Sequence, residues 1–176
     1  MGLKANLRWL GSACLLSLVV WVMTINLAIA PVQAAIRQIE EVPGQMVYQS
    51  RQTLKDQQGS SWQVIAFKRN RPDQTATLYL RLVGFPGTVA LDHSQPLILT
   101  DLLGKTLTAT DVSQEMFADK TQMEPNFGEY DLQPILMQLD PAIPLQITLP
   151  TLTSSEIILT ISPEVIGEWR SLTDKN

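Results

Sequence analysis

The sequence contains only one cysteine, Cys14, and one histidine, His93. Cys14 lies in an apolar N-terminal stretch that we expect to be removed, which would leave no thiol for a disulfide, a nucleophile or a thiolate metal site. A zinc or copper site would have to be built from carboxylates around His93, a ligand set that suits neither metal. No Asp-rich loop has the ligand spacing of a calcium site. We therefore expect no metal and no cofactor.

Motifs that position a catalytic group are also missing. No Gly-x-Ser-x-Gly motif is present to expose a serine nucleophile. Gly84 and Gly87 flank a proline and lead into extended chain, so they lack the helix N-terminus that would hold a phosphate. Asp92, His93 and Ser94 are the residue types of a hydrolase triad, but neighbours on extended chain point to opposite faces. We expect the protein not to be an enzyme, and a hydrolase using His93 is our third hypothesis.

The first 34 residues have the pattern of a secretory signal peptide. Lys4 and Arg8 precede an almost wholly apolar run over residues 9–30, and the small residue Ala34 follows at a position suited to signal peptidase. We predict cleavage after Ala34 and a single domain over residues 35–176. The apolar run is also about long enough to span a bilayer, so an uncleaved N-terminal membrane anchor is the alternative.

Charge is distributed unevenly along the predicted domain. Residues 37–81 contain seven basic and four acidic residues, whereas residues 82–176 contain four basic and thirteen acidic ones, so the domain carries a net charge of −6. Because duplex nucleic acids are bound by clustered Lys and Arg that neutralise phosphates, we exclude nucleic acid as a partner. The basic cluster of Lys68, Arg69 and Arg71 would suit an acidic partner or anionic head groups. The alternative is that this cluster is the solvated rim of a hairpin.

The clearest structural pattern lies between residues 75 and 85. Leu78, Leu80 and Leu82 alternate with polar residues, which is the period of a β-strand with one buried face. Residues 62–68 form a second β-rich run, and a turn over residues 70–74 joins the two runs into an antiparallel hairpin. The sequence Gly-Phe-Pro-Gly at 84–87 then predicts a type II turn.

Further strands are expected on both sides of this hairpin, at residues 45–51, 97–100, 106–110, 143–149 and 157–161. Pro144 and Pro150 donate no backbone hydrogen bond, which predicts a free edge for the strand that contains them. Residues 35–44 are expected to form a lead-in arm. Residues 111–130 are expected to form a long loop with one short helical turn.

Two short helices complete the prediction. Leu132, Ile135, Leu136 and Leu139 are spaced at i, i+3, i+4 and i+7, the apolar stripe of a helix. Ser162 before Pro163 is the favoured order at a helix start and predicts a C-terminal helix. The predicted fold is therefore mainly β (α+β). We expect a single antiparallel β-sandwich or partly open barrel with two short helices, and with Trp62 and Trp169 in its core.

Four stretches of the chain resemble a family of small exported cyanobacterial proteins that carry a domain of unknown function. They are PGQMVYQSRQTL at 43–54, RLVGFPG at 81–87, GEYDLQP at 128–134 and the closing Glu168-Trp169. The resemblance covers nearly all of residues 35–172. It implies a compartment, either the periplasm or the thylakoid lumen, and it implies no catalytic residues.

The leading functional hypothesis is an exported, non-enzymatic binding or assembly module whose partner is a protein or a membrane surface. Uneven charge can orient a protein on such a partner. The predicted contact residues are Lys68, Arg69, Arg71, Phe85 and Pro86, together with the apolar residues of the 111–130 loop. The alternative is a small β-barrel carrier that encloses an apolar ligand such as a lipid or a pigment, because the Leu and Ile faces could line a cavity.

Overall fold

The computed structural model of this chain describes residues 36–42, 45–69, 76–85, 87, 89–117, 123–153 and 156–175. All of them belong to one compact unit, Ala34–Asn176. The predicted signal peptide lies outside the described residues, as do the predicted contact residues Arg71 and Pro86.

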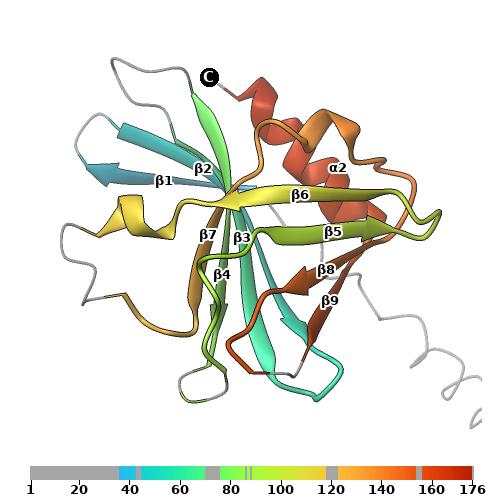
Figure 1. The fold of residues 1–176 in the computed structure, drawn as a ribbon. Helices are drawn as coiled ribbons and strands as arrows, with labels where there is room; N and C mark the ends of the chain where they lie inside the picture. The colour runs from blue at the N-terminus through green and yellow to red at the C-terminus, as the bar shows by residue number, and fades with distance from the viewer. Residues whose placement is uncertain are drawn as a thin grey trace, which may run out of the picture. The chain divides into compact units, whose positions relative to one another are not determined.

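The described part of the chain contains nine strands and one α-helix, labelled in Figure 1. The strands are β1 (Arg37–Val42), β2 (Gln45–Lys55), β3 (Ser61–Arg69), β4 (Thr77–Gly84), β5 (Leu97–Asp101), β6 (Thr106–Asp111), β7 (Phe127–Asp131), β8 (Leu145–Leu149) and β9 (Ile157–Ile161). The helix is α2 (Pro163–Ser171), and short 3-10 helices form η1 (Ser113–Met116), η3 (Leu136–Gln138) and η4 (Leu172–Asp174).

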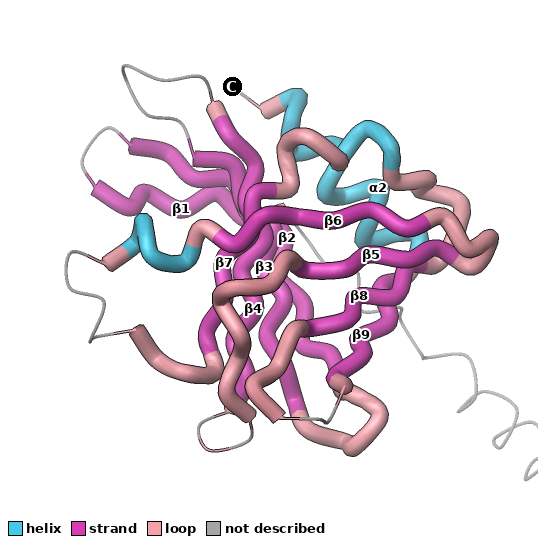
Figure 2. Tube along the Cα trace, viewed as in Figure 1, coloured by secondary structure: helices cyan, strands magenta, loops and turns pink. Residues whose placement is uncertain are grey.

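The strands form one open antiparallel sheet in the order β1-β2-β3-β4-β7-β6-β5-β8-β9. The strands fall into two groups. One group contains β1, β2, β3, β4 and β7, and the other contains β5, β6, β8 and β9. A short pairing between β6 and β7 joins the two groups. Only Thr110 with Asp131 and Asp111 with Tyr130 make that junction. Figure 2 shows β6 and β5 running across the view and β3, β4 and β7 running down it.

The predicted hairpin is confirmed as β3 and β4. Ala66 pairs with Leu80 and Val64 with Leu82, so side chains of the same parity share a face of the sheet. We call the face that carries these residues the core face, because it packs into the main hydrophobic cluster with the inward residues of β5, β8 and β9. The opposite side of β1–β4 and β7 is called the outer face.

Trp62 and Trp169 are both fully buried in the main cluster, as predicted. Trp62 pairs across the sheet with Gly84, and its indole Nε1 donates a hydrogen bond of 3.1 Å to Asp56 Oδ2. A Cβ at Gly84 would lie 2.9 Å from the Trp62 ring, so only glycine fits beneath the indole. Trp169 comes from α2, which starts at Pro163 after Ser162 as predicted and closes the core face.

Polar contacts fix the end of the chain on the same face. Ser50 of β2 donates a hydrogen bond of 2.6 Å from its hydroxyl to Glu168 Oε2 of α2. Burial raises the pKa of Glu168, and the bond from Ser50 opposes that shift. Lys68 Nζ donates to the backbone carbonyls of Thr173 and Lys175 after α2, so this ammonium binds free carbonyls at a helix end.

Four details of the sequence prediction are wrong. The predicted helix at 132–139 is a turn followed by η3, because Leu132 N still bonds Leu78 O in the sheet and Pro134 has no N–H to donate. The lead-in arm is largely strand β1, and the 111–130 loop contains strand β7. The strand that lies between Pro144 and Pro150 has no free edge, since β8 pairs with both β5 and β9.

Replacing Gly84 with Ala is expected to destabilise the fold by about 1–3 kcal/mol, because the new methyl group overpacks the buried Trp62 ring. Chemical denaturation of the purified protein measures this change. Gly167→Ala is the matched control. No atom lies within 4 Å of a Cβ at Gly167 in α2, and there alanine should raise helix stability by up to about 1 kcal/mol. Equal losses in the two variants would contradict the packing of Trp62 on Gly84.

Candidate functional site

Five basic side chains share the outer face of β1–β4. They occupy positions of one parity, so strand alternation brings them together. In the cross-strand register, Arg51 stands opposite Ile65, which stands opposite Arg81. None of the side chains that the structure describes on this face of these four strands is acidic. The five are Arg37, Arg51, Lys55, Arg69 and Arg81.

Aromatic rings lie beneath two of these arginines. Phe67 and Tyr79 pair across β3 and β4 with ring centroids 5.7 Å apart, and they form a second small cluster with Val47 and Ile65. The Arg69 guanidinium lies 5.2 Å from the Phe67 centroid and 5.7 Å from that of Tyr79. Stacking of this kind stabilises a guanidinium and restricts its orientation.

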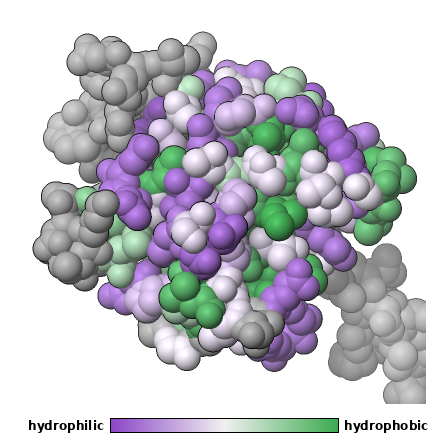
Figure 3. All heavy atoms as spheres, viewed as in Figure 1, coloured by the Kyte–Doolittle hydropathy of each residue, from purple (hydrophilic) through white to green (hydrophobic). Residues whose placement is uncertain are grey.

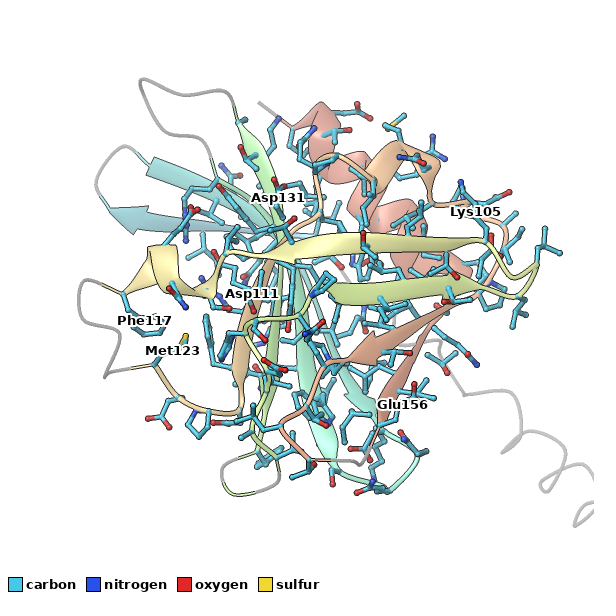
Figure 4. All side chains as sticks on the ribbon, in the orientation of Figure 1. Lys105, Asp111, Phe117, Met123, Asp131 and Glu156 are labelled. Atoms are coloured by element: carbon cyan, nitrogen blue, oxygen red, sulfur yellow. The ribbon has the colours of Figure 1, made fainter. Side chains whose placement is uncertain are left out.

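Arg81 lies on the other side of the same cluster. Its guanidinium is 4.8 Å from the Phe67 centroid and 5.6 Å from that of Phe127 in β7. Phe127 in turn meets Phe117 edge-to-face, with centroids 5.4 Å apart. Aromatic side chains from both ends of the 111–130 segment therefore extend the small cluster on the outer face. Figure 4 shows Phe117 and Met123, the residues that flank the undescribed part of this segment, next to each other.

One buried carboxylate orients both arginines. Glu129 of β7 is only 1% exposed, and its Oε2 accepts hydrogen bonds of 3.0 and 2.8 Å from Arg81 Nε and Nη2. Arg69 Nη1 lies 3.8 Å from Glu129 Oε1. The Ser113 hydroxyl donates to the Glu129 carbonyl and accepts from its N–H, which ties η1 to β7. Two guanidinium groups therefore face this one carboxylate.

The predicted contact residues that the structure describes, Lys68, Arg69 and Phe85, do not form one cluster. Lys68 and Arg69 are adjacent in sequence, but strand geometry turns Lys68 to the core face and Arg69 to the outer face. Each is only 8% exposed. Phe85 is exposed in the loop after β4. Five members of the site were not predicted from the sequence: Arg37, Arg51, Lys55, Arg81 and Glu129. The parity of the basic residues along the strands was the signal that could have found the cations.

His93 has a polar partner but no triad geometry. Its Nδ1 lies 2.9 Å from Asp111 Oδ2, and Asp111 Oδ1 accepts a bond of 2.8 Å from Ser113 N. The Ser94 hydroxyl donates to Asp92, 2.6 Å away, which lowers the pKa of that carboxyl. His93 Nε2, the atom that would deprotonate a nucleophile, is buried and has no hydrogen-bond partner among the described residues.

Tyr130 lies on the core face opposite Asp111. Burial, with a smaller effect from the Asp111 charge, raises the pKa of its phenol. Its hydroxyl is buried and unpaired among the described residues. A Cβ at Gly128 would lie 2.9 Å from that hydroxyl, so the ring packs directly over glycine. Close packing leaves little room for a substrate beside Tyr130.

A hollow between the β5–β6 turn, η3 and α2 has a volume of about 10 Å³. That is room for about one water molecule, far below the few hundred Å³ of a typical ligand pocket. Beside it, the β5–β6 turn exposes Leu102 and Leu103, where Figure 3 shows hydrophobic residues at the right-hand edge. Asp101 Oδ1 accepts from Leu103 N and Lys105 N, which stiffens this turn.

Within the described residues, no helix is long and apolar enough to cross a bilayer. The same part of the chain brings no three acidic, His or Cys side chains close enough to share a metal ion.

A family model described as "Protein of unknown function (DUF3122)" matches residues 34–172. The match spans all nine described strands and α2. No curated protein and no solved structure matches the chain. The expected domain of unknown function is thereby confirmed. Since this description names no activity, any function has to be argued from the geometry of the site.

Glu129→Gln is expected to destabilise the protein by about 3 kcal/mol, because it removes the buried charge that Arg81 and the nearly buried Arg69 both face. Urea denaturation at neutral pH measures the loss.

Glu124→Gln is the control for this change, since Glu124 is exposed and surface substitutions of this kind stay within about 0.5 kcal/mol. If Glu129→Gln changed stability no more than Glu124→Gln, the buried carboxylate would not be what holds the two arginines.

Proposed function

Because the chain belongs to the DUF3122 family, whose function is unknown, we propose its function from the outer face: it is an exported, non-enzymatic binding module that docks this face on an acidic partner. The apolar run at residues 9–30 and the likeness to exported cyanobacterial proteins support the location. We place the protein in the periplasm or the thylakoid lumen, either released after Ala34 or held by an N-terminal anchor.

Segregation of charge is the observation that carries this proposal. Residues 35–176 have a net charge of −6, yet the described side chains of the outer face include five cations on β1–β4 against two acids, Glu129 and Asp131, on β7. A basic face on an acidic body orients the molecule toward negative charge and repels partners that approach other faces.

The arrangement of the cations also favours recognition over diffuse attraction. Arg81, whose side chain is 24% exposed, is held by ring stacking and by Glu129, so little side-chain entropy would be lost when it meets a carboxylate. Arg37, Arg51 and Lys55 are exposed around them. A nearly buried, oriented centre with exposed cations at its rim resembles protein interfaces, which have a buried core and a polar rim.

The shape that we favour is a partly open barrel. A single continuous sheet, in which β6 pairs with both groups of strands, supports it over two separate layers. The side chain of Gln57, in the turn between β2 and β3, bonds Ile158 at the start of β9 and so links the two groups of strands a second time. The small hollow beneath the β5–β6 turn offers no support for a lipid or pigment carrier, so the binding module remains the leading function.

Reversing the three exposed cations in Arg37→Glu/Arg51→Glu/Lys55→Glu is expected to weaken partner binding at least about tenfold, because it removes the charge complementarity. Partners cross-linked to the wild-type protein in its native cells are first identified, and their affinities for both forms are then measured. Wild-type binding should also weaken as salt rises from 0.1 M to 1 M, where the Debye length falls from about 10 to about 3 Å.

Lys105→Glu/Arg170→Glu/Lys175→Glu is the matched control, since it changes the net charge equally but lies outside the outer face. It should retain the partner. Equal binding by the two triple variants would rule out the outer face as the docking surface.

A further inference from the structure

The two ends of the sheet are protected unequally. At the β9 end, the Gln57 side chain takes the place of a further strand: its Oε1 accepts a hydrogen bond of 2.9 Å from Ile158 N, and its Nε2 donates to Glu156 O. An amide side chain that bonds both a backbone donor and a backbone acceptor blocks pairing at that point. Proteins commonly protect sheet edges in this way to prevent unwanted strand addition.

The other end, β1, lacks such a cap among the residues that the structure describes. There β1 pairs only with β2, through a regular register from Arg37 with Gln49 to Glu40 with Met46. Figure 1 shows β1 at the margin of the sheet. Its described side chains, Arg37, Gln38 and Ile39, are all exposed. This edge therefore presents backbone donors and acceptors beside the basic outer face.

We propose that β1 accepts an extended segment of an acidic partner protein as an added strand, so that the partner continues the sheet and lies along the outer face. The inference rests on the proposed function and specifies how the partner is recognised. Main-chain hydrogen bonds along the edge supply affinity, and alternate side chains on the outer face supply specificity.

The outward side chains of β1 determine which sequence fits. Arg37 and Ile39 are two residues apart and lie on the outer face, where Ile39 stands beside Val47 of the small cluster. Cross-strand neighbours on one face interact, and opposite charges or two apolar residues are the favourable pairs. The added strand should therefore carry an acidic residue beside Arg37 and an apolar residue beside Ile39, which is the pattern acid–x–apolar in either direction.

The length of the pairing is limited. The β1–β2 register shifts between Glu40 and Val42, and such an irregularity twists an edge away from regular pairing. A short segment with one acidic end fits this edge better than a uniformly acidic tail.

A membrane surface fits these features less well than a polypeptide. Lipid head groups do not form a ladder of alternating donors and acceptors, so they leave the edge of β1 unused. The domain's net charge of −6 also opposes long-range attraction to an extended anionic plane. A protein partner needs only local complementarity.

The inference is tested by measuring the binding of capped synthetic peptides of about six residues, with Glu and Val two positions apart. The protein is purified from its native cells, with or without residues 1–34 as those cells leave it. The peptide that contains Glu (the Glu peptide) should bind the wild-type protein. The same peptide with Lys in place of Glu (the Lys peptide) should bind it more weakly. Arg37→Glu should weaken binding of the Glu peptide about three- to tenfold and restore binding of the Lys peptide, as a cross-strand charge pair requires. Lys175→Glu, an equal change of charge away from the edge, should leave both affinities unchanged.

Backbone methylation distinguishes strand addition from simple charge attraction. Only every second N–H of an added strand faces β1. N-methylation of one alternate set should therefore abolish binding, and methylation of the other set should leave it intact. If both methylated peptides bind equally well, or if neither binds, strand addition is ruled out.

The outcomes also separate this inference from the proposed function. If no peptide binds but the cellular partner is still lost from Arg37→Glu/Arg51→Glu/Lys55→Glu, the outer face docks the partner without strand addition. If vesicles of phosphatidylglycerol bind the wild-type protein and not that triple variant, and no peptide binds, the partner is a membrane and the inference is wrong. If the triple variant binds both the cellular partner and the vesicles as the wild-type protein does, the proposed function itself is rejected.

Discussion

Alternation of side chains across β2, β3 and β4 is the constraint on which the rest of this structure depends. Ser50, Ala66 and Leu80 lie side by side on the core face, and their sequence neighbours Arg51, Phe67 and Arg81 all fall on the outer face. A shift of one residue in the register would exchange the two sets and bury the cations in the main core. The same geometry that builds a stable interior therefore gathers the basic residues on one exposed surface.

Glu129 links stability to the proposed binding role. Removing a carboxylate from water carries a large desolvation penalty, and a nearly buried Glu is retained here only because two guanidinium groups face it. Replacing buried ion pairs with apolar residues of similar size is often neutral or stabilising in proteins. The polar solution is better explained by the orientation it gives to the guanidinium groups, of which that of Arg81 reaches the surface.

The residue pattern predicted those strands and helices that have one buried face and one solvent-exposed face. Leu78, Leu80 and Leu82 identified β4, and the capping order at Ser162 and Pro163 identified α2. β7 was missed because its polar Glu129 faces Arg81, a contact 48 residues away that no local pattern reveals. β1 was missed because an exposed edge strand has no buried face to impose alternation. The outer site needed the register of four strands, which decides that Lys68 and Arg69 point to opposite sides.

The near-absence of cysteine allows the division into two faces to be measured directly. With Cys14 replaced by Ser, single cysteines introduced at each position from Ser50 to Lys55 would report their exposure through the rate of thiol alkylation in the folded protein. The outward positions Arg51, Thr53 and Lys55 are exposed, whereas Ser50 is buried and Gln52 and Leu54 are half-buried. Our account predicts that reactivity alternates, with fast labelling at 51, 53 and 55 and slow labelling at 50, 52 and 54. Uniform labelling along this strand, or the opposite phase, would contradict it.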